Sequence, residues 1–112
     1  MALAGFNSPT QAFVCNLNAI SAADRPRYSE LVKQVREAIR ERIEVSDGYA
    51  FQLDGDALTL PEAAEWFSME RKCCPFLTLQ LSVSGSQTHW TLMLTGPEGV
   101  KALIDAEFPS RS

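Results

Sequence analysis

The sequence has little of what most catalytic machinery requires. It contains one histidine, no C-x-x-C pair, and no Walker or G-x-G-x-x-G motif. His89 falls on the outward register of its segment with no acidic residue expected nearby, so a Ser/His/Asp or Cys/His arrangement has little support. The absent C-x-x-C spacing argues against a thioredoxin-like centre, and the absent glycine motifs argue against a phosphate-binding loop.

Long apolar runs and an excess of positive charge are also missing. No window approaches the ~20 apolar residues of a transmembrane helix, and residues 1–10 lack the basic start and apolar run of a signal peptide. The net charge of −4 and the pI near 4.9 argue against a nucleic-acid or anionic membrane partner. We therefore expect a soluble protein with neither kind of partner.

Cysteine is scarce, and its pattern is unusual. There are three cysteines, an odd number, and Cys73 and Cys74 are adjacent. A secreted disulfide framework would use an even, spaced set, so reduced thiols in the cytoplasm are expected.

The chain of 112 residues predicts one α+β domain over residues 11–109, after a flexible N-terminal arm at 1–10. Apolar alternation predicts five strands, at 11–19, 43–45, 49–53, 77–84 and 88–95. A helical stripe precedes the second strand, at Tyr28, Leu31, Val32, Val35 and Ile39. A second helix is expected over 61–74, and a third after Gly99. Asp47-Gly48 predicts a hairpin between the second and third strands.

This order contains a β-α-β-β-α-β core, the ferredoxin-like arrangement, with an added C-terminal strand and helix. It predicts a largely antiparallel sheet in the order 2-3-1-4-5, with helices on one face. The other face is open or pairs with a second subunit. We expect a homodimer, through the sheet or the flank at Trp66.

The second predicted helix carries the only cluster of reactive side chains. Its helical phase places Ala63, Phe67, Glu70 and Cys74 on a core stripe, and Trp66, Met69 and Cys73 on a flanking stripe. Glu70 is thus the one charged residue directed inward. A carboxylate there is costly unless it is protonated or paired, so Glu70 is either functional or joined to an arginine such as Arg42 or Arg71.

Pro75 ends this helix, which lets two adjacent thiols converge better than they could within it. The leading hypothesis is a thiol site that binds a soft metal or metalloid ion through Cys73 and Cys74 with Glu70, with Cys15 as a candidate third cysteine. Catalysis is less favoured, because the negative end of a helix raises thiol pKa values. Two alternatives remain: a structural or interaction homodimer whose cysteines pack in the core, and an enzyme using Glu70 as an acid or base in a small pocket.

Two blocks, Glu70 to Phe76 (E-R-K-C-C-P-F) and Leu94 to Lys101 (L-T-G-P-E-G-V-K), resemble those of a group of small uncharacterised bacterial proteins. That group carries E-R-x-C-C-P-F and a later G-P-E-G. The resemblance implies no activity or catalytic residue. It implies that the two blocks belong to one compact unit.

Overall fold

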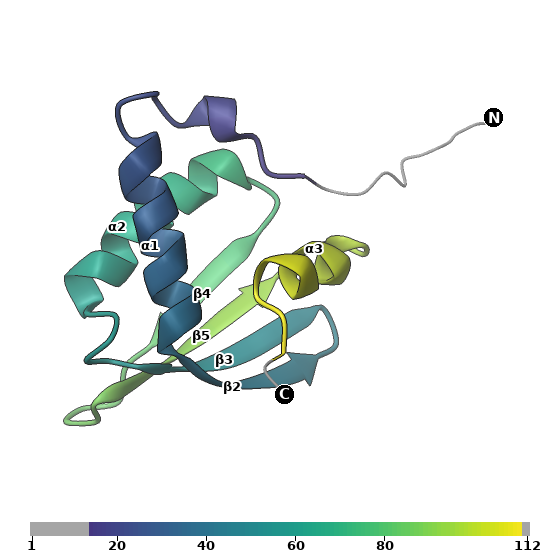
Figure 1. The fold of residues 1–112 in the computed structure, drawn as a ribbon. Helices are drawn as coiled ribbons and strands as arrows, with labels where there is room; N and C mark the ends of the chain where they lie inside the picture. Colours follow the sequence, from purple (N-terminus) through teal and green to yellow (C-terminus); the bar gives the residue numbers. More distant parts are fainter. Residues whose placement is uncertain (1–13, 111–112) are drawn as a thin grey trace.

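The computed structural model describes residues 14–110, which form a four-stranded sheet and three α-helices (Figure 1). The predicted arm at residues 1–10 lies outside the described residues. The elements in chain order are η1 (Leu17–Ala19), α1 (Arg25–Ala38), β2 (Ile39–Val45), β3 (Gly48–Asp54), α2 (Leu60–Cys73), β4 (Thr78–Ser82), β5 (His89–Thr95) and α3 (Val100–Glu107).

The sheet is antiparallel throughout, in the order β2-β3-β5-β4. All three helices contribute buried side chains to a single core cluster on one of its faces (Figure 1). The expected α+β class is confirmed, and the fold is broadly consistent with a ferredoxin-like arrangement. None of the helices in the described part of the chain has the length and apolar character needed to cross a membrane.

The expected first strand is wrong over the described residues 14–19. Residues 14–16 have no regular structure, and η1 follows them. The Asn16 side chain accepts from the backbone N–H of Asn18, a local bond that competes with strand pairing. Val14 and Leu17 are exposed at 72% and 51%, so the alternating pattern does not mark a buried face.

The expected strand order is consequently wrong as well. β5 lies between β3 and β4, where the first strand was expected. It pairs with β3 along the whole of both strands, from Gly48 opposite Thr95 to Asp54 opposite His89. The last strand therefore fills the centre of the sheet and leaves the N-terminal segment free to contact α2.

The hairpin between β2 and β3 is confirmed, but its turn residues are Ser46 and Asp47 rather than Asp47 and Gly48. Gly48 already pairs with Val45 and belongs to β3. A Cβ atom there would lie 1.9 Å from the carbonyl oxygen of Leu94. This glycine is needed for the close approach of β5, not for the turn.

The start of α2 is fixed by a capping box. The Thr59 side chain accepts from the backbone N–H of Glu62, and the Glu62 carboxylate accepts from the backbone N–H of Thr59. Pro61 fits the first turn, where its missing N–H costs nothing. The helix ends at Cys73, and the N–H of Cys74 still bonds the carbonyl of Glu70 at 2.7 Å. Both cysteines thus lie at a fixed helix terminus.

Candidate thiol site

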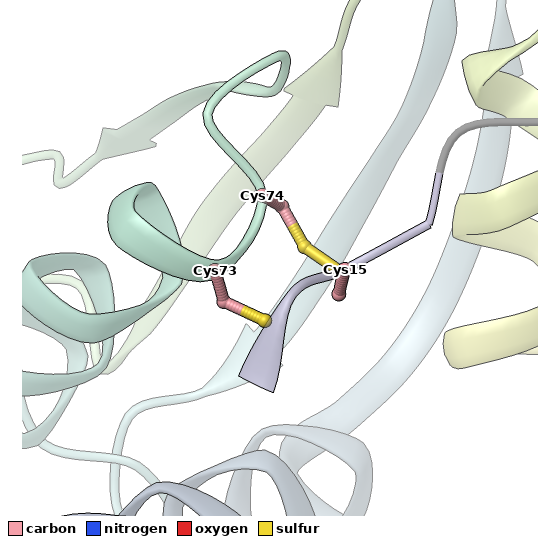
Figure 2. A group of neighbouring side chains, drawn as sticks. All are labelled: Cys15, Cys73 and Cys74. Carbon is pink, nitrogen blue, oxygen red and sulfur yellow. A yellow bond between two sulfur atoms is a disulfide. The ribbon is translucent and has the colours of Figure 1, made fainter. Parts of the chain in front are cut away.

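Three cysteine sulfurs from two distant segments meet at the C-terminal end of α2 (Figure 2). Cys73 is the last residue of α2 and Cys74 is its C-cap, whereas Cys15 lies just before η1. Their Sγ atoms all lie within 4.8 Å of one another. The structure therefore brings together all three cysteines named from the sequence.

The N-terminal segment is fastened to the helix end by its backbone. The N–H of Asn16 donates to the carbonyl of Cys73 at 2.8 Å. That carbonyl is among the last four of α2, which have no partner within the helix. Arg25 holds the other end of the segment, because its Nε donates to the carbonyls of Leu17 and Ile20. Cys15 is thus positioned by hydrogen bonds on its C-terminal side.

Cys15 and Cys74 form a disulfide, with their Cα atoms 4.8 Å apart, and Cys73 is a free thiol (Figure 2). The expectation of three reduced thiols is therefore wrong for this structure. Cys74 has left helical geometry, at φ −127° and ψ 70°, so the two adjacent side chains separate. Cys74 reaches Cys15, and Cys73 remains with the helix.

The three cysteines differ in access. Cys73 and Cys74 are fully buried, whereas Cys15 is partly exposed and packs against the edge of the core. Burial raises the pKa of the Cys73 thiol above its ordinary value, and the nearby Tyr28 hydroxyl opposes part of that rise. In the oxidised protein the only titratable thiol is therefore held in its neutral form.

Glu70 is connected to the thiols through Tyr28. The Tyr28 hydroxyl donates to Oε1 of Glu70 at 2.7 Å and lies 3.8 Å from Sγ of Cys73. Glu70 is 1% exposed, as its helical phase predicted. Desolvation raises its pKa to about 7, although the hydrogen bond from Tyr28 acts in the opposite direction. Burial and the neighbouring Glu70 charge in turn raise the pKa of Tyr28.

The expected ion pair of Glu70 with an arginine is wrong. Arg42 pairs with Asp105 at 2.6 Å, and Arg71 is exposed. Glu70 also stands outside the group of metal-ligating atoms that the three cysteines form. The Tyr28 hydroxyl lies between the Glu70 carboxyl group and the sulfur of Cys73.

The two stripes on α2 also differ from expectation. The buried residues of the helix are Ala63, Trp66, Glu70 and Cys73. Trp66 is fully buried and packs edge-on against Phe108, whereas Phe67 is only partly buried. The core face is therefore rotated toward the expected flank, because Phe108, the C-cap of α3, packs on that side. Trp66 itself is buried within the chain, and the expected dimer through its flank stays a prediction.

A cavity of about 390 Å³ opens beside Cys15. Its lining residues are Cys15, Leu17, Tyr28, Ser29, Val32, Arg36 and Glu107. Oε1 of Glu107 is buried there without a hydrogen-bond partner among the described residues. No sequence pattern marked Arg36 or Glu107, because both stand on ordinary charged helix positions. Tyr28 was visible only as a member of the α1 core stripe.

His89, the one histidine, is exposed on β5, as its register predicted. The two sequence blocks lie against each other. A Cβ at Gly96 would come within 3.0 Å of the carbonyl oxygen of Phe76, and Thr78 pairs with Thr95. Gly99 caps α3 at φ 99°, where glycine is favoured.

No protein-family model, no curated protein and no solved structure matches the chain. The resemblance of the two blocks to small bacterial proteins stays a prediction. The function must be inferred from the site itself.

Proposed function

We propose that the reduced protein binds one soft metal or metalloid ion through Cys15, Cys73 and Cys74. The observation that carries this proposal is the convergence of three sulfurs within 4.8 Å of one another. Thiolates are the ligands that Zn(II), Cu(I) and related thiophilic ions select.

The spacing suits a three-thiolate centre. Metal–sulfur bonds of about 2.3 Å place three sulfurs roughly 4 Å apart in a trigonal arrangement. The largest separation here exceeds that by less than an ångström. The disulfide pair must move apart after reduction, and the shift falls to Cys15, which is partly exposed, because Cys74 is fully buried at the end of α2.

The disulfide controls this binding. When Cys15 and Cys74 are joined, only the thiol of Cys73 remains, and one buried thiol is a poor site for any ion. We place the working protein in the cytoplasm, where the thiol pool reduces accessible disulfides. Glu70 and Tyr28 then lie behind the metal ligands and hold Cys73 in position.

Native mass spectrometry of oxidised and reduced protein tests the proposal. The protein is reduced, freed of reductant without oxygen, and titrated separately with Zn(II) and with arsenite. One ion per reduced chain and none per oxidised chain is the expected result. A reduced chain that stays free of both ions contradicts the proposal.

Two variants sharpen this test. Cys73→Ser leaves the Cys15–Cys74 pair intact but removes one of the three proposed ligands, so the reduced variant should no longer bind arsenite through three sulfurs. Cys15→Ser should have the same effect. Ser68→Ala, on the exposed side of α2, is the matched control and should bind as the wild type does. If the cysteines only pack the core, the cysteine variants lose stability while no form of the protein binds an ion.

A further inference from the structure

We propose that the cavity beside Cys15 binds a small zwitterionic thiol, one carrying both a carboxylate and an ammonium group, which reduces the Cys15–Cys74 disulfide. That this reaction opens the metal site rests on the function proposed above. The proposed reduction of the disulfide in this cavity is independent of that function.

Access selects the sulfur that is attacked. Cys74 is fully buried, whereas Cys15 is partly exposed and lines the cavity. Thiol–disulfide exchange requires the incoming thiolate to reach one sulfur of the bond. Attack therefore occurs at Cys15, and Cys74 is the leaving group.

The cavity walls match a ligand with two opposite charges. Arg36 donates through Nε to the carbonyl of Glu107, and its Nη groups have no hydrogen-bond partner in residues 14–110. They are available to a carboxylate, which a guanidinium binds strongly. Glu107 also lines the cavity, and its buried Oε1 lacks a partner among the described residues. A rotation of this side chain toward the cavity lets the carboxylate accept from an ammonium group.

The rest of the cavity suits the carbon skeleton of such a molecule. Leu17, Val32 and Tyr28 supply apolar surface. The volume of about 390 Å³ lies within the range of small-molecule sites. The cavity lining thus combines Cys15, one partner of the disulfide, with a basic and an acidic side chain.

The reaction balances with two thiols. The first thiolate attacks Sγ of Cys15, the Cys15–Cys74 bond breaks, and its electron pair leaves on Sγ of Cys74. A second thiolate attacks the ligand sulfur of the mixed disulfide and releases Cys15 as a thiolate. The protein gains two electrons and, at equilibrium with water, its two thiolates take up protons, while two ligand thiols become one ligand disulfide.

Reduction rates of the oxidised protein test the proposal, with glutathione as the zwitterionic probe and 2-mercaptoethanol as the uncharged one. Rates are compared at equal thiolate concentration and corrected for thiol basicity. We expect glutathione to react about tenfold faster. Arg36→Gln and Glu107→Gln should each lower the glutathione rate severalfold and leave the 2-mercaptoethanol rate within about twofold. Arg40→Gln, an exposed arginine paired with Asp54, is the control and should change neither rate.

Equal rates for the two probes, or equal losses for both in the Arg36 and Glu107 variants, overturn the proposal. The attacked sulfur is identified with Cys74→Ser, in which glutathione disulfide should modify Cys15 and spare Cys73. Modification of Cys73 instead would also overturn it.

The two proposals fail separately. A protein that shows no preference for glutathione, yet binds arsenite after reduction with a phosphine, disproves only the thiol cavity. A protein that prefers glutathione, yet binds no ion after phosphine reduction, disproves only the metal site.

Discussion

The hydroxyl of Tyr28 donates a hydrogen bond of 2.7 Å to Oε1 of Glu70, and both side chains are buried. This bond joins α1 to α2 inside the core. No ion pair involving Glu70 exists within the described residues, so the phenol is its main polar partner. Burial raises the pKa of the Glu70 carboxyl to about 7 against the effect of this hydrogen bond, so its protonated and ionised forms are both populated near neutral pH.

The raised pKa of Glu70 predicts a pH-dependent cost. The folded-state pKa is about 7 and the ordinary value is 4.5, so the folded protein binds this proton more tightly than the unfolded chain. The contribution of Glu70 to the free energy of unfolding is fully present below pH 4.5 and is lost as the pH rises through 7. Between these two pH values, the free energy of unfolding of Glu70→Gln should rise by about 3 kcal/mol relative to that of the wild type. Urea unfolding of both proteins from pH 4 to pH 8 measures this difference.

Glu65→Gln on the same helix is the control. The hydrogen bond with Arg27 lowers the pKa of Glu65, so its contribution is present above its ordinary pKa and lost on acidification. The difference in the free energy of unfolding between Glu65→Gln and the wild type should therefore change with pH in the direction opposite to that of Glu70→Gln. Parallel curves for the wild type and Glu70→Gln would show that Glu70 is ionised normally.

Reduction of the disulfide should weaken the fold without abolishing it. Cys15 and Cys74 are 59 residues apart, and a loop of that length corresponds to about 4 kcal/mol in the chain-entropy account. The core cluster contains many buried apolar side chains besides Cys74, so the fold has other sources of stability. Urea unfolding with and without a phosphine reductant measures the loss. Cys73→Ala should show the same difference, and no difference in either protein contradicts the prediction.

Helices and local signals were the predictable part of this fold. Thr59 and Pro61 marked the start of α2, and the phase of Glu70 directed it inward, because capping and helical periodicity act over a few residues. The position of β5 was not predictable in this way. The alternating segments before η1 and in β5 look alike in sequence, and pairing over a long separation decided between them.

The candidate site was predictable only in its cysteines. The helical phase correctly predicted that Cys73 and Cys74 lie on different sides of the helix end, because Cys74 is bonded to Cys15 whereas Cys73 is a free thiol. Their assignment to faces was reversed in part, because Phe108 packs against Trp66, and no local pattern in the sequence reports that contact. Arg36 and Glu107 meet at the cavity through the tertiary fold alone.

Gly48 should be among the least replaceable residues of the sheet. A Cβ at this position would lie 1.9 Å from the Leu94 carbonyl oxygen, a backbone atom fixed by strand pairing. Gly48→Ala should cost about 3 kcal/mol or more. Gly85→Ala is the comparison, since Gly85 has φ 51° but nothing within 4 Å, and it should cost about 1 kcal/mol. Similar unfolding free energies for the two variants would contradict this account.

The homodimer expected through the sheet stays a prediction, and the structure identifies the residue with which to test it. Ile43 is 54% exposed on the face of the sheet away from the helices, opposite Ala50, which in turn pairs with Met93. These three side chains form an apolar row across β2, β3 and β5 on the face away from the helices. If the row is a dimer interface, Ile43→Lys should convert a dimer into a folded monomer in sedimentation velocity. Val83→Lys, 40% exposed just after β4, should leave the dimer intact. A monomeric wild type at about 100 μM would exclude a dimer of ordinary affinity.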